Sequence, residues 1–222
     1  MPGKHPILKA LGTLTLALAL SHAAYAGPPL ICHPLVVGEG RLLPWGDEPG
    51  WFAPDPEYDI DRLRDDTLRL LSDDAPVLSR MENLRRATLY AHAADDPRIA
   101  IDLLKAVLER MQATAKSDAA TALAPFDAGY LIESYRQVGL VAEWGMSEAF
   151  RPSTIRALAE DLEPFDGYRL VQQAIELTAN ARAEMEFAAS LMTPDSAVAA
   201  KHRVRASEGA KPGSVLAANL AR

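Results

Sequence analysis

The residues of this 222-residue chain with the most versatile chemistry are Cys32, its single cysteine, and the adjacent His33. A thiolate and an imidazole are good ligands for zinc or copper. A structural metal site needs four ligands, so His92 and His202 would have to join the pair. These residues lie far apart in sequence and follow no C-x-x-C or H-x-x-x-H spacing. Cys32 and His33 are therefore weak candidates for a metal site.

Cys32 is also a candidate nucleophile, because a protonated His33 beside it would lower the pKa of the thiol. Catalytic Cys–His pairs normally come from separated segments whose side chains face each other. His92 or His202 would have to supply the base. The alternatives are pairing with another chain and burial as a small apolar residue, and we expect Cys32 to be buried.

Three carboxylates, those of Glu133, Glu184 and Glu186, lie within apolar segments that are predicted to be helical. Two carboxylates in one cleft can act as general acid and general base. More often, such residues lie at a helix boundary and pair with an arginine. The arginines available for this are Arg85, Arg86 and Arg136.

The three tryptophans, Trp45, Trp51 and Trp144, are candidate binding residues, because indole rings can line a groove for a sugar or a peptide. Their alternative role is to anchor a proline-rich segment by burial. Other motifs are absent from the sequence: there is no G-x-S-x-G elbow, and "GEG" at 38–40 lacks the rest of a phosphate-binding loop. We expect no cofactor and name no catalytic residue.

The N-terminal residues have the pattern of a signal peptide. Lys4, His5 and Lys9 precede an uncharged apolar run, residues 10–20, and "AYA" at 24–26 is a small-x-small cleavage site. The sequence therefore predicts a signal peptide over 1–26, cleaved after Ala26, and a secreted or periplasmic protein. The run is too short for a membrane span, and no later segment is apolar enough for one.

The charge of the chain argues against polyanionic partners. The formal net charge is −7, and removal of residues 1–26 takes away two lysines and no acids. We expect no binding to nucleic acid, because the field of the molecule repels phosphate. Arg80, Arg85 and Arg86 share one predicted helix with Glu82, and we interpret them as a solvated face.

One cysteine permits no internal disulfide, so stability must come from packing.

Residues 27–57, here called the arm, differ in composition from the rest of the chain. They contain seven prolines and five glycines, so no helix is expected. They also contain many large apolar residues, which a disordered tail would lack. We predict an extended arm packed on the body, in which "LVV" at 35–37 is compatible with a short strand, although no second strand is evident.

Residues 58–222 are predicted to form a helical domain. Apolar residues recur at a spacing of three or four, and prolines separate the segments. The fold class is therefore all-α, either a helix-hairpin array or an irregular helical bundle. The expected helices cover about 60–71, 78–91, 97–111, 154–161, 183–192, 197–207 and 214–221, with further helices after each copy of an internal repeat.

The internal repeat consists of "PFDAGYLIESYRQ" from Pro125 and "PFDGYRLVQQAIEL" from Pro164. Both copies suit the start of a helix. Asp127 and Asp166 are predicted N-caps, with a phenylalanine before each cap and a leucine four positions into each helix, as in a hydrophobic staple. The spacing of the copies suits arrays of helix pairs.

Two resemblances point to the architecture. "DPRIAIDLLKAVLER" at 96–110 resembles the second helix of a tetratricopeptide repeat. The segments "GPPLICHP", "LPW", "MENLRRATLYA", "FDAGY" and "MEFAASLMT" together resemble an uncharacterised family of secreted bacterial helical proteins. That resemblance implies shared architecture and export, and it implies no activity, because none is assigned to the family.

The sequence thus favours an exported interaction or scaffold protein of the cell envelope. Stacked helix pairs form extended concave surfaces suited to protein or peptide partners. The alternative is a metal- or thiol-dependent protein or enzyme that uses Cys32 and His33. The reactivity of Cys32 in the folded protein distinguishes the two.

Overall fold

The computed structural model describes residues 29–115, 122–145, 148–178 and 181–222. Within these ranges the regular structure is helical and includes no strand, which confirms the all-α prediction. The elements are α1 (Pro29–Cys32), the 3₁₀ turn η1 (Ile60–Arg62), α2 (Leu63–Leu70), α3 (Val77–Ala93), α4 (Arg98–Ala115), α5 (Leu123–Glu143), α6 (Pro152–Leu162), α7 (Gly167–Leu177), α8 (Arg182–Met192), α9 (Ser196–Gly209) and α10 (Val215–Leu220).

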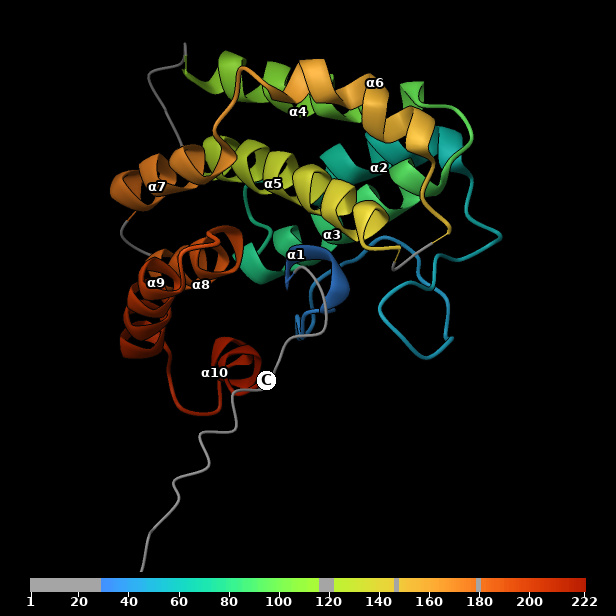
Figure 1. Cartoon of the computed structure of the whole chain (residues 1–222). Coiled ribbons are helices and arrows are strands. Elements are labelled where there is room, and N and C mark those ends of the chain that lie inside the picture. The colour runs from blue at the N-terminus through green and yellow to red at the C-terminus, as the bar shows by residue number, and fades with distance from the viewer. Residues whose placement is uncertain (1–28, 116–121, 146–147, 179–180) are drawn as a thin grey trace, which may run out of the picture.

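Helix α5 is the centre of the molecule. It contacts α1, α3, α4, α6, α7 and α8. Figure 1 shows α4 and α6 above α5 and α7, with α8, α9 and α10 below them. Helices α5 and α7 pack closely although α6 lies between them in sequence. The fold is therefore an irregular bundle around one helix. No helix of the described segments combines the length and apolar character needed to cross a membrane.

The central position of α5 follows from its composition. Its buried side chains cover every side of the helix, and a helix that is apolar all round must lie inside the fold. The largest are Phe126, Tyr130 and Tyr135, each at most 2% exposed. Helices α4 and α7 are amphipathic and turn their apolar stripes towards α5.

The two copies of the internal repeat begin helices differently. Asp166 caps α7 as predicted, since its carboxylate accepts a hydrogen bond from the Arg169 amide at 2.9 Å. The predicted cap at Asp127 is wrong: α5 starts at Leu123, and Asp127 is buried inside the helix. The N-terminal boundary is displaced because Asp127 pairs with Arg80 instead of with the α5 backbone.

The repeat nevertheless has a structural consequence, because its two glycines meet where α5 crosses α7. A Cβ on Gly167 would lie 2.6 Å from the Gly129 carbonyl oxygen, and a Cβ on Gly129 would collide with the Gly167 carbonyl oxygen. Only glycine at both positions allows the two backbones to approach this closely. Their contact fixes α7 against the centre of the bundle.

The arm follows the surface of the body over its described residues, 29–57. The absence of a helix was predicted, and this is wrong for α1, in which Pro29 occupies the first position, where its missing amide hydrogen has no consequence. The short strand suggested for 35–37 is also absent: this segment is irregular and its backbone bonds to side chains of the body. The predicted signal peptide and the cut after Ala26 lie outside the described residues.

Candidate functional site

Arg80, Glu82 and Arg85 of α3 are buried and Arg86 is only partly exposed, so our interpretation of these residues as a solvated face is wrong. Arg80 and Arg85 are 0% exposed. Arg80 pairs with Asp127 of α5 at 2.6 Å and donates to the carbonyl oxygens of Ser72 and Ala75. These charges are tolerated inside the protein because each has a partner in hydrogen-bonding geometry.

Glu82 is the centre of the second buried group. Its carboxylate accepts two hydrogen bonds from Arg85, both at 2.8 Å, one from Arg86 at 2.9 Å and one from the Leu35 amide at 3.0 Å. Burial alone would raise the pKa of Glu82, but the two arginines and the amide outweigh it and lower the pKa. The carboxylate is therefore ionised and joins α3 to the arm.

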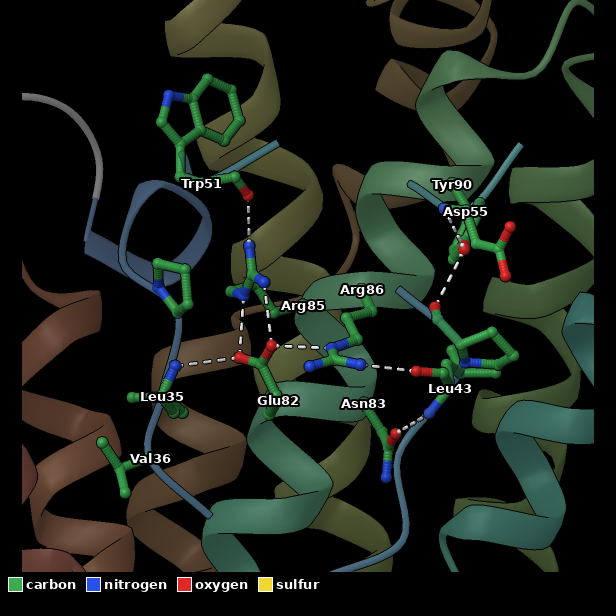
Figure 2. A network of polar contacts seen from close by, with 12 residues as sticks. Leu35, Val36, Leu43, Trp51, Asp55, Glu82, Asn83, Arg85, Arg86 and Tyr90 are labelled. Atoms are coloured by element: carbon green, nitrogen blue, oxygen red, sulfur yellow. Dashed lines mark hydrogen bonds and ion pairs between the residues drawn. The ribbon is translucent and has the colours of Figure 1, made fainter. Parts of the chain in front are cut away.

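The same face of α3 holds the arm by its backbone (Figure 2). Arg85 donates to the carbonyl oxygens of Ile31 at 3.1 Å and Trp51 at 2.9 Å. Arg86 donates to the carbonyl oxygen of Leu43 at 2.6 Å. Asn83 and Tyr90 extend this series of contacts to the backbone of Arg41, Leu43, Pro44 and Asp55. The contacts satisfy backbone groups that lack partners in regular structure.

Cys32 is buried, as expected, at 6% exposure. Burial raises the pKa of its thiol to about 11, against a smaller opposite effect of Arg85. Burial also lowers the pKa of His33, and the charges of Arg222 and Arg85 lower it further. A protonated thiol beside a neutral imidazole is a poor nucleophile and a poor metal ligand.

The other two histidines lie in separate environments. His92 is buried against Tyr135, and its Nδ1 lies 2.9 Å from the Thr88 carbonyl oxygen. His202 bridges Glu186 and Tyr168, with Nε2 2.7 Å from the tyrosine oxygen. In the part of the chain that the structure describes, no three His, Cys, Asp or Glu side chains are grouped so that they could hold a metal ion.

The three tryptophans do not form one groove. Trp45 packs edge-on against Tyr90 at 5.4 Å, with the guanidinium groups of Arg85 and Arg86 over its ring. Trp51 packs against Phe150. These two anchor the arm, whereas Trp144 lies at the end of α5 and is 59% exposed. Anchoring is therefore the observed role of Trp45 and Trp51.

The three candidate carboxylates are also separated. Glu133 pairs with Arg136 at 2.5 Å, the partner proposed from the sequence, and accepts from the Gly167 amide. Glu186 pairs with His202, and Arg85 and Arg86 bind Glu82 instead. Glu184 is half-buried and forms no ion pair with any described residue.

Glu184 lines a cleft that has a volume of about 540 Å³. Five segments form it: arm residues 37–41, the end of α2 with the α2–α3 connection, the first turn of α3, Glu184 of α8, and the start of α10. Its apolar wall consists of Val37, Leu70, Val77, Leu78, Val215 and Leu216. A concave, largely apolar site with a few polar groups is typical of ligand-binding sites.

The buried floor of the cleft offers hydrogen-bond donors, whereas its rim carries mainly carboxylates. At the floor, α3 begins after Pro76, which provides no side-chain cap, and Ser79 is 1% exposed with no hydrogen-bond partner for Oγ among the described residues. At the rim, three carboxylates face one guanidinium, that of Arg41; the carboxylates are Glu39, Asp74 and Glu184. The rim is therefore net negative.

Comparison with known proteins does not add to this description: no protein-family model, curated protein or solved structure matches the chain. Of the polar residues of the cleft, the sequence singled out only Glu184. No sequence pattern marks Ser79 as a site residue, because a serine within an apolar helical stretch is common. Only the tertiary structure brings Ser79 to the cleft.

Proposed function

We propose that the protein is an exported interaction protein of the cell envelope that binds a peptide segment of its partner in the cleft between the arm and α3. The signal-peptide pattern of residues 1–26 supports export. The observation that carries the proposal is the cleft itself, with about 540 Å³, an apolar wall and polar groups at floor and rim.

Several properties of the cleft suit a peptide. Its volume accommodates two or three residues of an extended chain, and its wall accepts apolar side chains. The face of α3 beyond the cleft already holds an extended segment, the arm, by side-chain contacts to its backbone. Recognition of an extended chain through its backbone is a recurring mode of peptide binding.

Photocrosslinking in the native envelope tests this function. A photoreactive side chain in place of Glu39, at the rim, is expected to give discrete adducts with a partner. The same side chain in place of exposed Glu160, on α6, is the control and should give none. Equal labelling from both positions, or no adduct from position 39, would contradict the proposal.

A further inference from the structure

We infer that the cleft takes the free amino-terminal end of a peptide, with its ammonium group at the acidic rim and its first carbonyl oxygen at the start of α3. This inference rests on the proposed function, because it specifies the peptide that the cleft binds. Three observations lead to it: the unpartnered serine at the floor, the uncapped helix and the charge of the rim.

The floor provides hydrogen-bond donors. The first amides of a helix have no partner within the helix and form its positive end. In α3, which is 17 residues long, the N-cap residue is Pro76, whose side chain forms no cap hydrogen bond. Ser79, in the same turn, is 1% exposed and lines the cleft, and its hydroxyl has no hydrogen-bond partner within the described segments.

A buried hydroxyl without a partner is uncommon in folded proteins. The Ser79 hydroxyl points towards Gly40, which also lines the cleft, and a Cβ at Gly40 would collide with it. The hydroxyl oxygen thus lies beneath Gly40 at the junction of the arm and α3, and a ligand oxygen in the cleft completes its hydrogen bonding when Gly40 moves aside. The floor therefore selects for an acceptor oxygen.

The rim selects for a cation. Glu39, Asp74 and Glu184 come from the arm, the α2–α3 connection and α8, and among the described lining residues Arg41 is the single cationic side chain. Hydrogen bonds from the Ser72 hydroxyl and from its own backbone lower the pKa of Asp74, so this carboxylate is ionised. Glu184 has no ion-pair partner among the described residues.

One common group satisfies both ends of the cleft. The amino end of a peptide places an ammonium group next to a carbonyl oxygen, and capture of a chain terminus in this way is a known recognition mode. A free anion such as phosphate suits the floor but is repelled by the rim. A lysine side chain suits the rim but brings no carbonyl oxygen adjacent to its ammonium group.

Calorimetric titration with the tripeptide amide Ala-Leu-Leu-NH₂ and with its N-acetylated form tests the inference on the unmodified protein. We expect acetylation to weaken binding at least tenfold, because it removes the charge that the rim recognises. Equal binding of the two forms overturns the inference and leaves the proposed function standing. Binding of neither form overturns both.

Two variants locate the contacts. Glu184→Gln is expected to weaken binding of the free amine about fivefold, whereas Glu208→Gln, an exposed carboxylate of α9, leaves it unchanged. Ser79→Ala is expected to weaken binding about fivefold without lowering the melting temperature, because it removes a hydroxyl that has no partner among the residues described in the unliganded fold. Unchanged affinity in both variants, or competition by inorganic phosphate, overturns the inference.

Discussion

Cys32 shows how burial alters the chemistry of a single side chain. Its thiol pKa is raised from 9.0 to about 11, so the thiolate fraction at pH 8 is roughly 100-fold smaller than that of an ordinary thiol. We predict that iodoacetamide alkylates Cys32 at least about 100-fold more slowly in the native protein than in urea. Mass spectrometry of the modified chain measures both rates. Equal rates would restore Cys32 as a reactive residue.

His92 gives a second prediction at the residue scale, concerning stability and pH. Burial lowers the pKa of His92 from 6.5 to about 4, against the opposing effect of the Thr88 carbonyl oxygen. As the pH falls from 6.5, the unfolded chain binds a proton that the folded protein does not. Stability that is present above pH 6.5 is therefore lost on the way to pH 4, by about 3 kcal/mol from this group.

Urea unfolding of the wild type and of His92→Phe at pH 7.5 and 4.5 measures this effect. The phenyl ring keeps the contact with Tyr135 and has no proton to bind. The wild type should lose more stability between the two pH values than the variant does. The same loss in both proteins would show that His92 does not carry this part of the pH dependence.

At the scale of elements, the ion-pair network of Glu82 determines whether the arm stays on α3. We predict that Glu82→Gln destabilises the fold by about 3 kcal/mol, because it leaves the buried charge of Arg85 without a counter-charge. The arm should then exchange faster than the body: hydrogen exchange at Leu35, whose amide donates to Glu82, is the direct readout.

The control for this variant is Asp65→Asn, which breaks an exposed ion pair with Arg64. Exposed pairs contribute little, so a change of less than about 0.5 kcal/mol is expected, with no effect on the arm. If both variants had the same small effect, the Glu82 network would not be what fixes the arm.

The crossing of α5 and α7 gives a matched pair of substitutions on one helix. Gly129→Ala should destabilise the fold by about 1–3 kcal/mol, because the added Cβ collides with the Gly167 carbonyl oxygen. Gly139→Ala should stabilise it by about 0.5–1 kcal/mol, because its Cβ meets only Ile155 at 3.9 Å and alanine favours the helix. Thermal unfolding measures both, and opposite signs are the expected outcome.

The elements themselves were largely predictable, because they depend on local patterns. Apolar spacing and proline positions predicted α3, α6, α8 and α9 to within a few residues. The same local pattern predicted two N-caps, and one of these predictions was wrong. Asp127 and Asp166 both follow a Pro-Phe dipeptide, yet only Asp166 is a cap. The difference lies in Arg80, whose contact with Asp127 crosses 47 positions and leaves no trace in a local window.

At the scale of the whole molecule, the candidate site depends on contacts between distant segments. Arg85 bonds to the backbone of Ile31 and Trp51, which are 54 and 34 positions away in the sequence. Because these partners are remote, the sequence around Arg85 wrongly suggested a solvated helix face. The cleft joins five segments from residue 37 to residue 216. The composition of the arm predicted that it would pack on the body, but no sequence pattern predicted the cavity that it leaves at the start of α3.

The most direct test of this account is an NMR titration of the ¹⁵N-labelled protein with Ala-Leu-Leu-NH₂. The peptide should shift the amide resonances of Gly38, Ser79 and Val215, which line the cleft from the arm, α3 and α10. The indole resonance of Trp144, exposed at the end of α5, should stay unchanged. Shifts at Trp144 without shifts at the three cleft amides, or no shifts at all, would contradict the claim that this cleft binds peptides.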